Sequence, residues 1–195
     1  MLILAVGSTG CVAGGGGSGP LVEGNQEAVC GVPEGTGIAE GTVWGNWEVT
    51  DCEGNPTSLY NNAFCSAEAT VYIRMQGWCG NCQREAPTLM DDLIAPNEAR
   101  GVRFLQIIQE NEAYEPVDGE FCSYWANQNN LGGHVYMDPA RNTSRLVLTP
   151  GVPYTQGALP IIKVIDRDGV IRADLSGDPE GWVHVQAAID EILAE

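Results

Sequence analysis

The sequence predicts an α/β fold, in which a central mixed β-sheet carries helices on both faces. Three observations indicate this class. The apolar, β-branched run 69–75 is followed by a helical segment, 83–93, and then by a second apolar run, 102–108. Near the end of the chain, a strand–turn–strand pattern precedes 179–193, where apolar residues recur at helical spacing. Buried strands that alternate with helices are typical of a sheet covered on both faces.

The remaining elements follow from local patterns. We expect a first strand at 43–49 and a turn at 51–56 that leads into a short second element. Pro87 falls within the predicted helix and should bend it, because proline removes a backbone hydrogen bond. Further elements are expected as an acidic loop at 111–119, a helix at 120–129, a strand at 134–137, a helical turn at 141–148, strands at 161–165 and 170–175, and a hairpin turn at 166–169.

The charge of the chain excludes some partners. The formal net charge is −17, from 9 basic and 26 acidic residues, and Lys163 is the only lysine. We expect no nucleic-acid partner, because phosphate binding depends on clustered Lys and Arg. A polybasic attraction to anionic lipid is excluded for the same reason. We interpret the acidity as a solvated, self-repelling surface, with adaptation to high salt as the alternative.

Residues 1–11 resemble the end of a secretion signal, because a short apolar run gives way to small residues. The run is too short to span a bilayer, which takes about 20 apolar residues. Its ending is similar to a bacterial lipobox, which would make Cys11 the lipidated residue and the membrane anchor. Ser8 stands where the lipobox usually has leucine, and no basic residue precedes the run. An incidental cysteine is the alternative.

The segment 12–40 is rich in glycine and contains few large apolar residues. We therefore expect a flexible linker, followed by a folded domain at 41–195. About thirty coil residues would reach roughly 30 Å, which would hold the domain clear of a lipid surface.

The motif Cys79-Gly80-Asn81-Cys82 stands where a predicted strand gives way to a predicted helix. The unpaired N–H groups of a helix start favour a thiolate at the first cysteine and so lower its pKa. The second thiol, one turn on, is placed to attack a mixed disulfide. Half of a zinc site is the alternative, but no second Cys-x-x-Cys or Cys-x-x-His accompanies the motif. The motif therefore predicts a redox pair.

Seven cysteines in total are typical of an exported chain. Besides the redox pair and the N-terminal cysteine, four remain as candidates for two structural disulfides in any of three connectivities. These are Cys30, Cys52, Cys65 and Cys122. A turn separates Cys52 from Cys65, so a local bridge between them is the first expectation, which leaves Cys30 with Cys122. Buried free thiols are the alternative.

Three markers in order resemble the thioredoxin superfamily. They are the Trp-Cys-x-x-Cys at 78–82, Pro87 five residues past the second cysteine, and Pro160 at the start of a late strand within 157–169. The Asp-x-x-Gly turn at 51–54 is similar to that of the exported TlpA/ResA-like thiol-disulfide oxidoreductases. The resemblance covers 41–195 and implies a thioredoxin-like three-layer α/β/α fold with an N-terminal β-hairpin extension.

The resemblance also implies roles for single residues. Cys79 would be the exposed nucleophile and Cys82 the buried resolving cysteine. Trp78 would pack beside the disulfide, the alternative being a simple core aromatic. Pro160 would follow a cis peptide bond that faces the disulfide, and the preceding backbone at Leu159 would be free to pair with substrate.

The sequence departs from the family at several positions. Gly80-Asn81 replaces the Gly-Pro of ordinary thioredoxins, so the reduction potential cannot be transferred. Ile73 replaces the buried aspartate of thioredoxin. Glu110 or Glu112 would take the place of a proton-relay glutamate found in related exported proteins, although we expect either one to be a solvated loop carboxylate.

No metal or other cofactor is expected. His134 and His184 are far apart and have no ligand cluster around them. The Cys-x-x-Cys spacing differs from the Cys-x-x-x-Cys of copper-chaperone relatives. Gln76 stands where peroxidase relatives have a threonine.

Together these features predict a thiol-disulfide oxidoreductase of the bacterial cell envelope, periplasm-facing or extracellular and anchored by lipid alone. It would act, as a monomer, on disulfide- or thiol-bearing proteins with an external electron donor. Reduction of partner disulfides is the first expectation, and oxidation or isomerisation would use the same residues. The alternative is a non-catalytic thioredoxin-fold binding domain in which the Cys79–Cys82 disulfide is structural.

Overall fold

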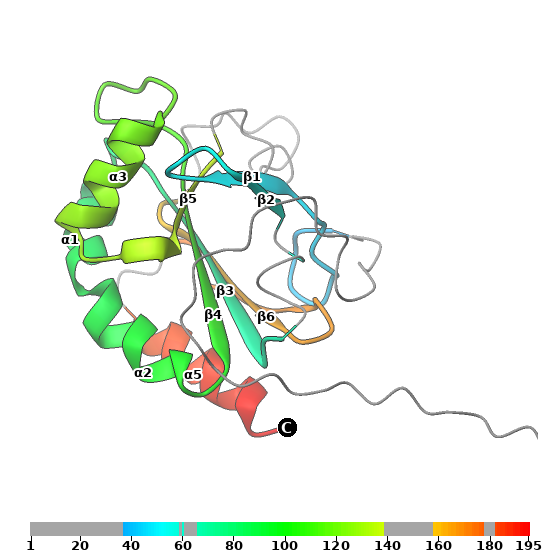
Figure 1. Ribbon diagram of the computed structural model, residues 1–195. Coiled ribbons are helices and arrows are strands. Elements are labelled where there is room, and N and C mark those ends of the chain that lie inside the picture. The colour runs from blue at the N-terminus through cyan, green and yellow to red at the C-terminus, as the bar shows by residue number, and fades with distance from the viewer. Residues whose placement is uncertain (1–36, 59, 61–65, 139–157, 178–181) are drawn as a thin grey trace, which may run out of the picture.

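The computed structural model of the protein describes residues 37–58, 60, 66–138, 158–177 and 182–195. Its centre is a mixed seven-stranded sheet with the strand order β2-β1-β5-β4-β3-β6-β7 (Figure 1). The strands are β1 (Glu48–Asp51), β2 (Pro56–Ser58), β3 (Ala69–Met75), β4 (Val102–Ile108), β5 (Val135–Met137), β6 (Ile161–Asp166) and β7 (Ile171–Asp174). The helices are α1 (Gly80–Leu89), the π-helix η2 (Met90–Ile94), α2 (Ala95–Glu98), α3 (Gly119–Gln128), the 3-10 helix η3 (Gly132–His134) and α5 (Val183–Leu193).

The two central strands lie where the sequence predicts them. β3 pairs in parallel with β4 and antiparallel with β6, and every residue of β3 is buried. A strand that is buried on both faces is mostly apolar on both, which is why 69–75 and 102–108 appear as largely apolar runs. The α/β class with a central mixed sheet is confirmed.

Side-chain hydrogen bonds attach the helices to the sheet and to one another. The indole N–H of Trp125 on α3 donates to Gln106 Oε1 on β4 at 3.2 Å. On the helices that precede β4, Thr88 Oγ1 accepts from the Trp182 indole at 3.0 Å, and Asn97 bonds to Gln186 of α5 at 2.7 Å. These contacts fix α1, and with it the cysteine motif, against the C-terminal part of the chain.

The expected first strand at 43–49 is wrong in its position. β1 begins only at Glu48, and it forms an antiparallel hairpin with β2 that extends the sheet through β5. Val43 instead forms an isolated bridge with Val170, and the buried Trp44 ring packs against Tyr72 at 5.0 Å. The Trp44 backbone N–H also donates to the Gly169 carbonyl at 2.8 Å, so this segment lies along the turn between β6 and β7. The expected N-terminal hairpin extension is confirmed.

The predicted helix at 83–93 is longer and less regular than expected. Its first part, α1, starts at Gly80 because Cys79 is the N-cap, and it continues through Pro87 to Leu89. The chain then passes through the π-helix η2 into α2. Proline lacks the N–H for one helical bond and displaces the carbonyl one turn earlier, so a local change of helical pattern after Pro87 has a physical cause.

The expected disulfide between Cys52 and Cys65 is also wrong, because Cys52 is bonded to Cys122 across a sequence separation of 70. β1 pairs with β5 and α3 packs on β5, and this arrangement brings the turn after β1 against the first turn of α3. At Gly119, an added Cβ would lie 2.6 Å from the Cys52 carbonyl oxygen, which shows how closely the two segments approach. The pairing of Cys30 with Cys122 is excluded with it.

Several expectations fall on residues outside the described ranges. They are the signal-like segment with Cys11, most of the linker, Cys30, Cys65 and the helical turn at 141–148. Near the C-terminus, the hairpin turn at 166–169 is confirmed, with Gly169 at φ 80°. None of the described helices is both long and apolar enough to cross a membrane.

Candidate redox site

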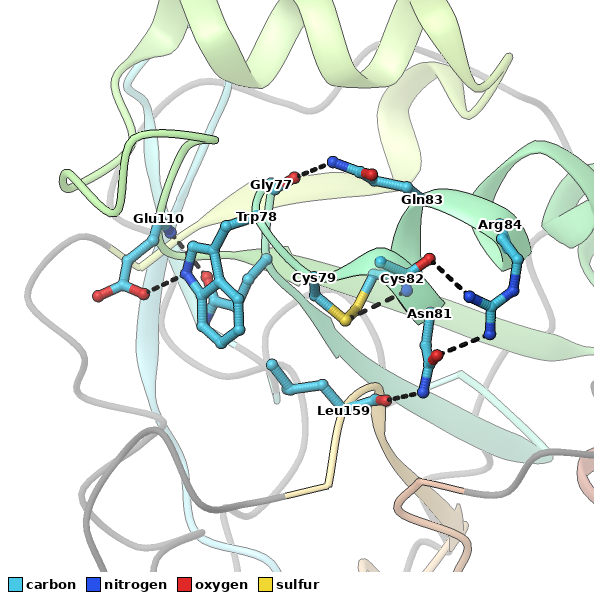
Figure 2. Close-up of a disulfide and its surroundings, with 11 residues drawn as sticks. Gly77, Trp78, Cys79, Asn81, Cys82, Gln83, Arg84, Glu110 and Leu159 are labelled. Carbon is cyan, nitrogen blue, oxygen red and sulfur yellow. Dashed lines mark hydrogen bonds between the residues drawn. A yellow bond between two sulfur atoms is a disulfide. The ribbon is translucent and has the colours of Figure 1, made fainter.

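The cysteine motif lies at the N-terminus of α1, and its two cysteines are joined in a disulfide (Figure 2). The extended backbone of Cys79 places its sulfur in the N-cap position, where it accepts a hydrogen bond of 3.2 Å from the Cys82 backbone N–H. Cys82 is fully buried, and Cys79 is 6% exposed. Cys79 is therefore less exposed than expected, but it is the member of the pair that retains accessible surface. The helix start stabilises negative charge on that sulfur when the disulfide is opened.

Trp78 is held on one side of the disulfide by a buried carboxylate (Figure 2). Its indole N–H donates to Glu110 Oε2 at 2.7 Å, and the Glu110 backbone N–H donates to Gln76 Oε1 at 2.8 Å. Glu110 is only 4% exposed, so the expectation of a solvated loop carboxylate is wrong for this residue. The cause is that the chain folds back after β4, where Glu110 bridges to Pro116. Glu112, in contrast, is exposed as expected.

Tyr114 is a neighbour of the site that the sequence analysis missed. Its ring stacks on Trp78 with centroids 4.9 Å apart and planes at 17°, and the residue is 61% exposed. The loop presents it in a left-handed conformation, φ 65°, which the Asn111 side chain stabilises by accepting from the backbone N–H groups of Ala113 and Glu115. The only signal in the sequence was Asn111, three residues before Tyr114 in the acidic loop. An asparagine there indicates a turn, but it does not predict that Tyr114 contacts Trp78.

Polar side chains buried beneath the motif connect the ends of three adjacent strands. Gln76 Nε2 donates to Gln109 Oε1 at 3.2 Å, and Gln109 Nε2 donates to Asp138 Oδ2 at 2.9 Å. All three residues are at most 2% exposed. Gly77 follows in the same place, and an added Cβ there would lie 2.7 Å from the Asn111 backbone and from Phe121. The chain segment that leads from β3 into the motif is therefore tightly packed.

On the other side of the disulfide lies a cluster formed by Asn81, Arg84 and Leu159 (Figure 2). Asn81 Nδ2 donates to the backbone oxygen of Leu159 at 3.3 Å. Arg84 donates to Asn81 Oδ1 at 2.6 Å and to the Gly80 carbonyl at 3.3 Å. The backbone before Pro160 was expected to be free, and in this respect the expectation is wrong, because the Leu159 carbonyl already has a partner.

The peptide bond between Leu159 and Pro160 is cis, as the resemblance implies. Both residues are buried, and the Pro160 carbonyl accepts from the Gly177 N–H at 2.8 Å. A side chain at Gly177 would meet the Ala158 Cβ at 2.3 Å, so glycine is needed there for the two segments to approach. The structure thus brings Leu159 and Pro160 beside the Cys79–Cys82 motif across a long separation in sequence.

The two histidines lie on other elements, His134 in η3 and His184 in α5. His134 pairs with Glu98 at 3.4 Å, and burial lowers its pKa although Glu98 acts in the opposite direction. His184 is an exposed residue of α5. Among the described residues, no group of three His, Cys, Asp or Glu side chains is placed to hold a metal ion.

Comparison with family models and with curated protein sequences finds no match to the chain. Solved structures do match. The thioredoxin domain of a thiol-disulfide oxidoreductase from Bacteroides vulgatus has a TM-score of 0.60 at 17% identity, over 80% of this chain and 99% of that one. A thiol:disulfide interchange protein from Bacteroides sp. has a TM-score of 0.60 at 17% identity, over 81% and 92%.

A third similar structure is a secreted Mycobacterium tuberculosis disulfide oxidoreductase homologous to E. coli DsbE. It has a TM-score of 0.53 at 18% identity, over 76% of this chain and 94% of that one. At these identities the likeness establishes the fold. The chain has a thioredoxin-like fold, which it shares with these structures, and it carries a Cys-x-x-Cys disulfide at the start of its first long helix.

Proposed function

We propose that the protein is a thiol-disulfide oxidoreductase that exchanges electrons with partner proteins through Cys79 and Cys82. The observation that carries this proposal is the N-cap position of Cys79, whose sulfur accepts the Cys82 N–H at 3.2 Å. A helix N-terminus favours the thiolate, which is the nucleophile in disulfide exchange. A purely structural bridge would not need this placement.

In the reducing direction, the Cys79 thiolate attacks one sulfur of a partner disulfide and forms a mixed disulfide, and the other partner sulfur leaves as a thiolate. The Cys82 thiol then loses its proton and attacks Cys79, so that the Cys79–Cys82 disulfide forms and the partner is released as a dithiol. Cys79 takes the first role because Cys82 is fully buried. An external donor must reduce the pair again, and an oxidase would run the same steps in reverse.

Of the two glutamates, we propose Glu110 as the proton relay to Cys82. It is buried against Trp78, next to the motif, whereas Glu112 is exposed. The supporting roles of Trp78, Gly80, Asn81, Leu159 and Pro160 belong to the same proposal.

We further propose that the protein works in the bacterial cell envelope, tethered by lipidation of Cys11. The Cys52–Cys122 disulfide supports an oxidising compartment. One similar structure is of a secreted protein. Mass spectrometry of the mature N-terminus tests the anchor, and an unmodified Cys11 would contradict it.

A trapping experiment tests the redox function. Cys82→Ser removes the resolving thiol, so it should accumulate mixed disulfides through Cys79, while the wild type should catalyse insulin reduction by dithiothreitol. The double variant Cys79→Ser, Cys82→Ser is the matched control and should do neither. If Cys82→Ser traps no partner and the wild type leaves insulin unreduced, the motif is structural and the protein is a binding domain.

A further inference from the structure

We propose that Asn81 is a positioning residue that occupies the Leu159 carbonyl until a partner polypeptide displaces it. The partner would supply a main-chain N–H from an extended segment that carries its reacting cysteine. This inference rests on the proposed redox function and concerns how the same site admits its substrate.

The orientation of the Asn81 carboxamide is fixed by its two neighbours (Figure 2). Arg84 Nη2 lies 2.6 Å from Oδ1, and a guanidinium only donates hydrogen bonds. The amide nitrogen must therefore face the other way, where it meets the Leu159 carbonyl oxygen at 3.3 Å. Because Arg84 also bonds to the Gly80 carbonyl, it holds the Gly80-Asn81 dipeptide in this arrangement.

The Leu159 carbonyl has no main-chain partner among the described residues. The ladder between β3 and β6 ends at the pair Arg74 and Ile161. The next carbonyl along the chain, that of Pro160, already accepts from Gly177. Leu159 thus presents a backbone acceptor beyond the last paired position of the sheet, next to the disulfide. An extended polypeptide that adds to such an edge binds through its own N–H groups.

The bond from Asn81 is suited to displacement. At 3.3 Å it is longer than the usual range for N–H···O bonds, and both Asn81 and Arg84 are exposed. The carboxamide can therefore turn into solvent, where water satisfies its own hydrogen bonds, while the Leu159 carbonyl becomes available to the partner. A partner N–H would replace one hydrogen bond by another, and Asn81 competes with it.

Arg84 helps Asn81 to compete with a partner N–H for the Leu159 carbonyl, because no other described residue holds its guanidinium away from Asn81. The hydrogen bonds of its guanidinium go to Asn81 and Gly80, and it forms no ion pair within the described part of the chain. By contrast, Arg100, Arg167 and Arg172 are each paired with carboxylates. Removal of the guanidinium should free the carboxamide without removing it.

The test uses the oxidised protein and a synthetic peptide dithiol. Peptide thiolate attacks Cys79, the Cys79–Cys82 bond breaks, and the second peptide thiolate resolves the mixed disulfide, so the peptide is oxidised and the protein pair reduced. The second-order rate constant is measured for the peptide and for versions N-methylated, one at a time, at the reacting cysteine and at each of its neighbours. The rate constant of the unmodified peptide divided by that of an N-methylated peptide reports the contribution of the main-chain N–H at that position.

In Asn81→Ala, we expect this ratio to rise about three- to tenfold at one methylation position, as the loss of a competing hydrogen bond predicts. Arg84→Met should raise the ratio at the same position by less. Asn127→Ala, an exposed asparagine on α3, is the matched control and should leave the ratio as in the wild type.

The ratio cancels any effect of Asn81 on the reactivity of the disulfide itself. An unchanged ratio in Asn81→Ala, or a lower one, overturns the inference, and a lower ratio would mean that Asn81 helps to bind the partner. If even the plain peptide leaves the wild-type pair oxidised, the proposed redox function fails and the inference fails with it.

Discussion

The indole N–H of Trp78 donates a hydrogen bond of 2.7 Å to Oε2 of Glu110, and this bond ties the residue before the redox pair to the chain that leaves β4. Glu110 is itself anchored, because its backbone N–H donates to Gln76. The motif is thus positioned by the carboxyl ends of β3 and β4 together, and not by its helix alone.

Glu110→Ala should therefore release Trp78 and lower the free energy of unfolding by about 1.5–3 kcal/mol, the range for a hydrogen bond to a charged group. Glu110→Gln keeps a hydrogen-bond acceptor, so its free energy of unfolding should fall by less. Denaturant unfolding and tryptophan fluorescence measure both effects. Glu112→Ala, the exposed neighbour on the same loop, should change stability by less than about 0.5 kcal/mol. Equal effects at the two positions would contradict the assigned bond.

The stack of Tyr114 on Trp78 leads to a second prediction. Tyr114→Ala should reduce stability by about 0.5–1.5 kcal/mol and increase the solvent exposure of Trp78, seen as a red shift of tryptophan emission. Tyr124→Ala is a suitable comparison, because that exposed ring packs on Phe121 instead. A red shift of the same size in both variants would argue against the stack.

The Cys52–Cys122 bond should contribute to stability through the length of the loop that it closes. At a sequence separation of 70, the chain-entropy model gives about 4 kcal/mol. The double variant Cys52→Ala, Cys122→Ala should unfold at correspondingly lower denaturant concentration while the Cys79–Cys82 pair still exchanges. Peptide mapping of the non-reduced protein should find the bond directly, and a Cys52–Cys65 peptide would refute it.

The buried Lys163 predicts a pH dependence of stability through Asp174, with which it forms an ion pair. Burial raises the pKa of Asp174, but hydrogen bonds from Lys163 and Ser176 outweigh burial, and the pKa lies below its ordinary value. The carboxylate therefore stabilises the fold fully above about pH 4 and loses this effect as the pH falls through the folded pKa.

Asp174→Asn should accordingly cost about 1–3 kcal/mol at pH 7, less than for a fully buried pair because the Asp174 side chain is 38% exposed. As the pH falls below about 4 and through the folded pKa of Asp174, the difference from the wild type should shrink, because the protonated aspartic acid, like asparagine, carries no charge. Urea titrations at pH 7 and pH 3 make the comparison. A deficit that stays constant across this range would exclude the ion pair as its source.

Features that depend on local pattern could be read from the sequence. β3 and β4 were predicted at their observed bounds, because strands buried on both faces leave continuous apolar runs. The Cys79-x-x-Cys82 motif was placed at a helix start because it stands between the first of these predicted strands and a predicted helix. The cis bond before Pro160 was expected from family resemblance, since nothing in local pattern distinguishes it.

Features that depend on tertiary placement could not be read in this way. Cys52 meets Cys122 only because β1 pairs with β5, and the sequence offered a nearer partner, Cys65. Glu110 looks like part of a solvated acidic loop until the chain folds back over it. The contact between Asn81 and Leu159 spans a separation of 78 residues and has no signature in either segment.

The reduction potential of the Cys79–Cys82 pair tests the central claim most directly. The oxidised protein is equilibrated in glutathione redox buffers, free thiols are alkylated, and the fraction of reduced pair is read by mass spectrometry. A redox-active pair should titrate reversibly between about −270 and −120 mV, the range of known oxidoreductases. A pair that stays oxidised to below about −300 mV, as structural disulfides do, would contradict the claim.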